Sequence, residues 1–136
     1  MNRAEVITMV RETNDENQRI TKMITIDREC FSFADVEEAA ELLRNGRLVA
    51  FPTETVYGLG ASAYNEDAIA KIYEAKGRPS DNPLIVHIAD VSEVSKVARE
   101  VPDAAKKLFD AFAPGPFTLI LKKNPEIADR VTAGLD

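Results

Sequence analysis

The segment of residues 76–83, KGRPSDNP, combines two cations with a restricted backbone. Lys76 and Arg78 stand one residue apart, and Pro79 and Pro83 limit the conformations of the chain beside them. Arginine offers phosphate oxygens a planar fork, and lysine offers them a compact positive charge. We interpret the segment as a clamp for a polyphosphate. The alternative is that Lys76 and Arg78 only bind the last carbonyl groups of a preceding helix.

The loop of residues 52–62 carries hydroxyl groups and glycines. Thr53 and Thr55 can both donate and accept hydrogen bonds. Gly58 and Gly60 suit either a tight turn with positive φ or the close approach of the backbone to a ligand, and both explanations stay open. We expect this loop to bind a small polar substrate, and we expect the active site between the loop and residues 76–83.

The glycines also match a dinucleotide-binding pattern approximately. Gly58, Gly60 and Ala63 fit G-x-G-x-x-A between a predicted strand and a predicted helix, and Asp90 could take the place of the ribose-binding acid. In that motif the first glycine follows the strand almost at once, whereas here residues 52–57 intervene. A nicotinamide-binding domain therefore remains the less favoured alternative.

His87 is the only histidine of the chain. It lies in a predicted strand, residues 84–88, with its side chain directed away from those of Val86 and Ile88. A lone histidine in such a strand is more often a hydrogen-bonded core residue than a catalyst. Because Cys30 is the only cysteine, a zinc site is disfavoured and no disulfide can form within the chain. We expect the thiol of Cys30 to be buried.

Two carboxylates lie in the loops that we assign to the active site. Glu54 belongs to the loop of residues 52–62, and Asp81 belongs to the turn of residues 76–83. Carboxylate oxygens are suitable ligands for Mg²⁺, which accompanies nucleoside triphosphates. Either residue could help to hold Mg²⁺ around a triphosphate, although most exposed carboxylates bind no metal.

The composition is that of one globular domain. The chain has 136 residues, 45% of them apolar, and its net charge of −6 argues against a broad surface that binds nucleic acid. Its apolar runs fall far short of the ~20 residues that span a bilayer, and its N-terminus does not resemble a secretory signal. We expect a cytoplasmic protein that does not bind membranes.

The periodicity of apolar residues predicts an α/β fold, with an open twisted sheet that is flanked by helices and incomplete in this chain. Residues 1–22 are polar, and we expect a mobile extension or a short helix there, followed by one domain at residues 23–136. Helices are predicted at 35–45, 66–76, 92–99 and 102–112. In the first of these, Asp35 is the N-cap and Glu38 completes a capping box. The second is bounded by Asn65 as N-cap and Gly77 as the C-terminal stop. Strands are predicted at 23–27, 48–51, 84–88 and 117–121.

Four blocks of the sequence resemble one enzyme family. FPTETVYGLG, KGRPSDNPLIVHI, APGPFTLIL and VTAGLD, with the spacing between them, are similar to the YrdC-type L-threonylcarbamoyladenylate synthases. The resemblance extends from about residue 23 to residue 136. It implies a YrdC-like domain and a nucleotidyltransferase that forms threonylcarbamoyl-AMP and pyrophosphate from L-threonine, bicarbonate or CO₂, and ATP. The product of that family serves the N6-threonylcarbamoylation of adenosine 37 in tRNA.

The resemblance also implies roles for individual residues. Thr55 and His87 would contact threonine, and Arg78 and Asn82 would contact ATP. Lys76 would lie against the phosphates or the carboxylated intermediate, so Lys76 and Arg78 form the expected catalytic pair. Mg²⁺ would enter with ATP as part of the substrate, and the protein itself would hold no further metal.

The family pattern continues beyond the VTAGLD block, with a threonine and an arginine that bind ATP and threonine and then a Ser-Ala-Asn segment. These residues do not occur in the present sequence, so we expect a fragment whose activity in isolation is uncertain. The expected partners are small molecules and, downstream, the tRNA threonylcarbamoyl-transferase machinery, without stable binding of tRNA. Two alternatives stay open: an RNA-binding YrdC-like module, and a YrdC-like carbamoyl-transfer domain of a larger maturation enzyme.

Overall fold

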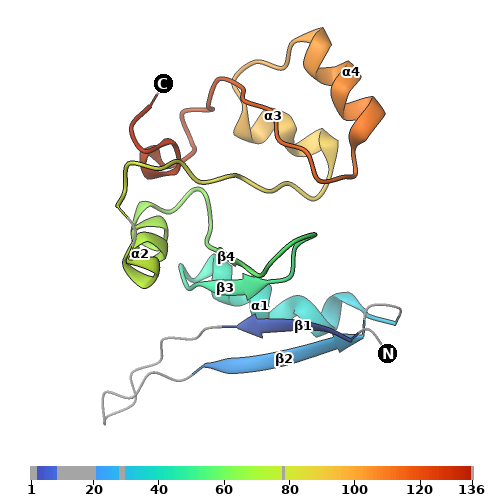
Figure 1. Cartoon of the computed structure of the whole chain (residues 1–136), viewed down its shortest axis with the longest axis vertical. Helices are drawn as coiled ribbons and strands as arrows, with labels where there is room; N and C mark the ends of the chain where they lie inside the picture. The colour runs from blue at the N-terminus through green and yellow to red at the C-terminus, as the bar shows by residue number, and fades with distance from the viewer. Residues whose placement is uncertain (1–2, 9–20, 28–29, 78, 136) are drawn as a thin grey trace. The chain divides into compact units, whose positions relative to one another are not determined.

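The structure is a computed structural model that describes residues 3–8, 21–27, 30–77 and 79–135. The chain divides into two compact units, Met1–Arg78 and Pro79–Asp136, and each is considered by itself. The boundary between the units lies far from residue 22, where the sequence predicted the start of a single domain. The chain has an α/β fold, with helices and small antiparallel sheets (Figure 1). Among the described residues, no helix has the length and apolar character needed to cross a membrane.

The first two strands form an antiparallel pair. β1 (Arg3–Thr8) pairs with β2 (Lys22–Asp27), with Val6 opposite Ile24. The prediction of a strand at 23–27 is confirmed. The prediction of an extension or short helix was wrong for residues 3–8, and residues 9–20 lie outside the described part. The strand was missed because β structure depends on a distant partner, which a local reading of a polar segment does not reveal.

Helix α1 (Phe33–Arg44) begins two residues before the predicted range of 35–45, and its N-cap lies three residues before the predicted cap. Ser32 is the N-cap, and the Asp35 carboxylate accepts hydrogen bonds from the Ser32 backbone N–H at 2.6 Å and from its hydroxyl at 3.0 Å. Asp35 therefore occupies the third helical position of a capping box rather than the cap itself. The helix buries Ala39 and contacts the third strand (Figure 1).

A short hairpin presents the loop that was assigned to substrate. β3 (Val49–Phe51) pairs antiparallel with β4 (Gly58–Gly60), so that Phe51 is opposite Gly58. A Cβ added at Gly60 would lie 2.5 Å from Cε1 of Phe51. Neither Gly58 nor Gly60 has a positive φ, so the tight-turn explanation was wrong. The absence of a side chain at residue 60 instead lets the Phe51 ring lie against the backbone of β4.

Helix α2 (Glu66–Lys76) has the predicted limits. The Asn65 side chain accepts a hydrogen bond from the Ala68 N–H at 3.0 Å and thereby caps the first turn. Gly77 ends the helix in the left-handed conformation, with φ of 57°, which glycine adopts without strain. The buried face contains Ala68, Ile69, Ile72 and Tyr73.

The named elements in the described part of the second unit are all helices, and extended or irregular segments connect them. Its elements are η1 (Val91–Glu93), α3 (Val94–Val97), α4 (Asp103–Phe112) and η2 (Asp129–Thr132). The predicted helix at 92–99 is therefore shorter than expected, whereas α4 confirms the prediction at 102–112 to within one residue. The buried residues of this unit are Ala98, Ala105, Ile127, Ala128 and Val131.

Two predicted strands of this unit are not formed. Residues 84–88 and 117–121 have no strand assignment in the described structure, although the Leu84 N–H donates to the Val131 carbonyl at 2.8 Å. Ile85 is 63% exposed and Ile120 is 98% exposed, so neither segment is covered on both faces. The apolar runs were recognised correctly, but a strand also needs a neighbouring strand with which to exchange backbone hydrogen bonds.

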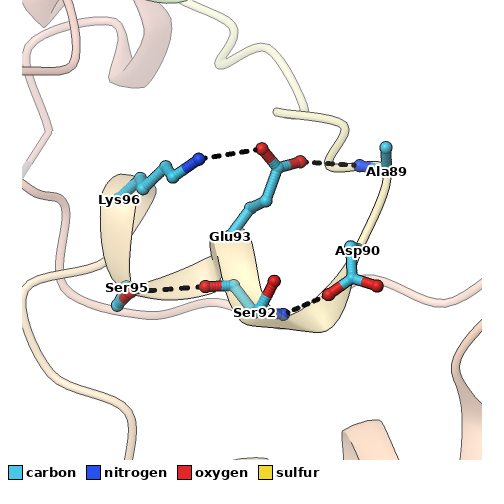
Figure 2. A network of polar contacts seen from close by, with 6 residues as sticks. All are labelled: Ala89, Asp90, Ser92, Glu93, Ser95 and Lys96. Carbon is cyan, nitrogen blue, oxygen red and sulfur yellow. Dashed lines mark hydrogen bonds and ion pairs between the residues drawn. The ribbon is translucent and has the colours of Figure 1, made fainter.

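Carboxylates organise the turn that follows residues 84–88 (Figure 2). Asp90 accepts from the Ser92 N–H at 2.8 Å and caps η1. Glu93 accepts from the Ala89 N–H at 3.3 Å through one oxygen and from the Lys96 ammonium at 3.1 Å through the other. The side chain of Asp90 thus serves as a cap for η1, and the interpretation of Asp90 as a ribose-binding acid loses its support.

These hydrogen bonds lower the pKa of both carboxyl groups. For Glu93 the largest cause is the hydrogen bond from the Lys96 side chain, followed by that from the Ala89 backbone. For Asp90 the cause is hydrogen bonding from Ser92. A carboxylate with a lowered pKa stabilises the fold at pH values above its ordinary pKa, and this contribution disappears as the pH falls through the lowered value. The turn should therefore loosen only under acidic conditions, below about pH 4.

The packing of Phe51 on β4 leads to a first prediction. We expect Gly60→Ala to reduce the free energy of unfolding by about 1–3 kcal/mol, because its Cβ would overlap the Phe51 ring and overpacking costs roughly this amount. Gly58→Ala is the matched control, since its Cβ would lie at the ordinary contact distance of 3.4 Å from Phe51 Cε2. Urea denaturation measures both variants. Equal effects would show that the ring does not lie over Gly60.

A second prediction concerns the carboxylate turn. We expect Lys96→Met to raise the pKa of Glu93, because the substitution removes the largest cause that lowers it. The pKa of Asp90, which depends on Ser92, should stay unchanged and serves as the internal control. Titration of the side-chain carboxyl carbons by NMR gives both values. An unchanged titration of Glu93 would mean that the ion pair with Lys96 does not form in solution.

Candidate functional site

The tip of the β3–β4 hairpin holds the first group of candidate residues. The Thr53 hydroxyl donates to the Val56 carbonyl at 2.5 Å and accepts from the Thr55 N–H at 3.2 Å. The hydroxyl oxygens of Thr53 and Thr55 lie 3.4 Å apart. Thr53 is half-buried, whereas Glu54 and Thr55 are exposed. The loop is thus held from within by Thr53, and it presents Thr55 to solvent.

Lys76 stands at the end of α2 and is exposed. The backbone N–H of Gly77, rather than the Lys76 ammonium, binds the carbonyls of Tyr73 and Glu74. Among the described residues, Lys76 makes no hydrogen bond and no ion pair. The structure therefore does not support the alternative in which Lys76 binds the last carbonyl groups of the helix. Arg78, the other member of the predicted cationic pair, lies outside the described residues.

Asn82 and His87 belong to the second unit, and both are exposed. Along residues 84–88, Val86 and Ile88 are half-buried while His87 is exposed, which confirms that the histidine side chain points away from theirs. The interpretation of His87 as a core residue was wrong. Thr55 and Lys76 belong to the first unit, so a site that joins all these residues stays a prediction.

The remaining polar candidates do not form a metal centre in the described residues, where no group of three or more His, Cys, Asp or Glu side chains could hold an ion. Glu54 belongs to the first unit and Asp81 to the second, and both side chains are exposed. Cys30 is exposed and has a free thiol, so the expectation of a buried cysteine was wrong. Its position just before the N-cap of α1 leaves it outside the apolar core.

The dinucleotide-binding interpretation fails on geometry. Gly58 and Gly60 lie within the strand β4, and α2 begins at Glu66 with Asn65 as its cap. In the dinucleotide motif the glycines form the turn that leads directly into the helix.

The hydrogen bonds of the Thr53 hydroxyl within the loop are the feature that the sequence analysis did not assign. The spacing of Thr53 and Thr55 is the available signal, because threonine often binds the backbone N–H two residues ahead.

Comparison with known proteins gives a consistent result across sequences. The family model Sua5_yciO_yrdC, described as telomere recombination, matches residues 41–136. A threonylcarbamoyl-AMP synthase of Bacillus subtilis is 60% identical over 102 residues, which cover 74% of this chain and 30% of the relative. The protein of the same name from Pyrococcus abyssi is 54% identical over 98 residues, which cover 72% of this chain and 29% of the relative. The chain thus spans about a third of the length of these relatives.

Solved structures agree with this result. A crystal structure of P. abyssi Sua5 complexed with L-threonine matches with a TM-score of 0.75 and 50% identity, over 79% of this chain and 32% of that one. A doubly substituted form of P. abyssi Sua5 matches with a TM-score of 0.76, again at 50% identity, over 80% of this chain and 33% of that one. The family model covers well over half of the present sequence. On these grounds the chain belongs to the Sua5, YciO and YrdC family.

Proposed function

We propose that this chain supplies part of the active site of an L-threonylcarbamoyladenylate synthase, a nucleotidyltransferase that acts in the cytoplasm. The observation that carries the proposal is the 60% identity over 102 residues with a protein named threonylcarbamoyl-AMP synthase. The substrates would be L-threonine, bicarbonate or CO₂, and ATP with its Mg²⁺. The product would feed the threonylcarbamoylation of adenosine 37 in tRNA, through a separate transferase.

The reaction carboxylates threonine and then joins it to AMP. The threonine amine forms a carbamate, either from CO₂ with release of a proton or from bicarbonate with loss of water, and a carbamate oxygen attacks the α-phosphorus of ATP. The bond from that phosphorus to the bridging oxygen of the β-phosphate breaks, and pyrophosphate leaves. Such a reaction needs positioned reactants and positive charge more than it needs covalent chemistry from the protein.

The residues of this chain suit those two tasks. Lys76 is exposed at the end of α2, without an ion pair among the described residues, and would offset the charge of the phosphates. Arg78 would bind phosphate oxygens through its guanidinium group, and Asn82 would hold ATP. Thr55 and His87 would hold threonine. Glu54 and Asp81 have the carboxylate oxygens that Mg²⁺ prefers, but no step of the reaction described above depends on them.

The charge of the chain favours this function over RNA binding. A net charge of −6 disfavours non-specific binding of RNA, which depends on cationic side chains that neutralise phosphates. Salt-dependent binding of RNA that does not require ATP would support the RNA-binding alternative. Transfer of a carbamoyl group to an acceptor other than free threonine would support the maturation-enzyme alternative.

A third prediction tests the proposed function. The assay uses the polypeptide that the gene produces, and the intact mass of that polypeptide should be measured first. With MgATP, L-threonine and bicarbonate, we expect release of pyrophosphate that depends on threonine. We expect Lys76→Ala and Arg78→Ala each to slow this release by at least about 100-fold, as is typical when a group that stabilises transition-state charge is removed.

Lys107→Ala is the matched control, because Lys107 is exposed on α4 and has no partner among the described residues. Its pyrophosphate release should equal that of the unsubstituted protein. Near-normal turnover after both Lys76→Ala and Arg78→Ala would rule out the proposed roles of these residues. Formation of no threonylcarbamoyl-AMP by the unsubstituted protein would overturn the proposed function for this chain.

A further inference from the structure

We propose that Thr53 is a positioning residue that holds the backbone of the loop at Thr55, so that the Thr55 side chain meets the amino-acid substrate in a defined position. The inference rests on the proposed function for the identity of that substrate. It goes further by stating which residue sets the position of Thr55.

The positions of the hydrogen-bonding groups lead to this assignment. A threonine hydroxyl has one proton to donate and two lone pairs that accept. The Thr53 proton is directed at the Val56 carbonyl oxygen, 2.5 Å away. The two hydroxyl oxygens lie 3.4 Å apart, which is longer than an ordinary O–H···O hydrogen bond. Thr53 also accepts from the Thr55 N–H at 3.2 Å.

Thr53 is held firmly enough to act in this way. It is half-buried, and its methyl carbon lies 3.4 Å from the position that a Cβ at Gly58 would occupy. The same glycine backbone lies beside the Phe51 ring. The methyl group of Thr53 is thus directed toward Gly58 while its hydroxyl binds the backbone of Val56 and Thr55. These hydrogen bonds set the backbone position of Thr55 before any ligand binds.

A fourth prediction tests the positioning role with a matched pair of variants. Thr53→Val keeps the shape of the side chain and removes the hydroxyl, whereas Thr53→Ser keeps the hydroxyl and removes the methyl group. We expect the Thr55 amide to lose protection from hydrogen exchange in Thr53→Val and to retain it in Thr53→Ser, as measured by NMR. Retained protection in Thr53→Val, with the fold intact by circular dichroism, would overturn the proposal.

Binding of L-threonine, measured by calorimetry on the full chain, tests the consequence for the ligand. We expect Thr53→Val to weaken binding about five- to tenfold, the usual effect of one hydrogen bond, and Thr53→Ser to restore it. The double variant Thr53→Val, Thr55→Val should bind no more weakly than Thr55→Val alone, because Thr53 acts through Thr55. Additive losses would mean a merely structural role and would overturn the proposal.

Two further outcomes separate the inference from the proposed function. If the unsubstituted chain binds no L-threonine, the proposed function fails for this chain, while the exchange of the Thr55 amide still decides the role of Thr53. If threonine binds and Thr53→Val binds it equally well, the function stands and the positioning role fails.

Discussion

The contact between the Phe51 ring and the bare backbone of Gly60 determines the geometry of the loop that carries Thr55. β3 and β4 have three residues each, so few backbone hydrogen bonds hold the hairpin together. Close packing of an aromatic ring adds buried area to this short pair. Residues 52–57 connect the two strands and derive their position from it. The loop is also held from within, because Thr53 forms hydrogen bonds with the backbone of Val56 and Thr55, and a binding site with defined geometry needs such support.

The exposure of Lys76 at the end of α2 is the second feature on which the candidate site depends. A cation in the last turn interacts favourably with the helix dipole, and here the αL conformation of Gly77 leaves the carbonyls to the backbone. Ala68, Ile69 and Ile72 of α2 are buried, and the Lys71 ammonium donates to the Gly46 carbonyl at 2.8 Å. The Lys76 ammonium is exposed at the end of this helix and makes no ion pair among the described residues.

The second unit presents its candidate residues on an extended segment. Residues 84–88 expose Ile85 and His87 and partly bury the alternate side chains, although the segment does not pair as a strand in the described structure. The hydrogen bond from Leu84 to Val131 holds the beginning of the segment, and the carboxylates of Asp90 and Glu93 organise the turn that follows it. His87 thus lies between two places at which hydrogen bonds hold the chain, although residues 84–88 are not part of a sheet in the described structure.

The sequence by itself determined the local features and the family. Asn65 and Gly77 defined α2 because capping depends on residues near the helix end, and the motif blocks identified the relatives that the comparisons later found. Tertiary structure alone decided that Gly58 and Gly60 form a strand beneath Phe51, and that residues 3–8 pair with β2. It also decided that residues 84–88 and 117–121 form no strand in the described part. The physical reason is that strand pairing and ring packing depend on partners distant in the chain, which local patterns do not specify.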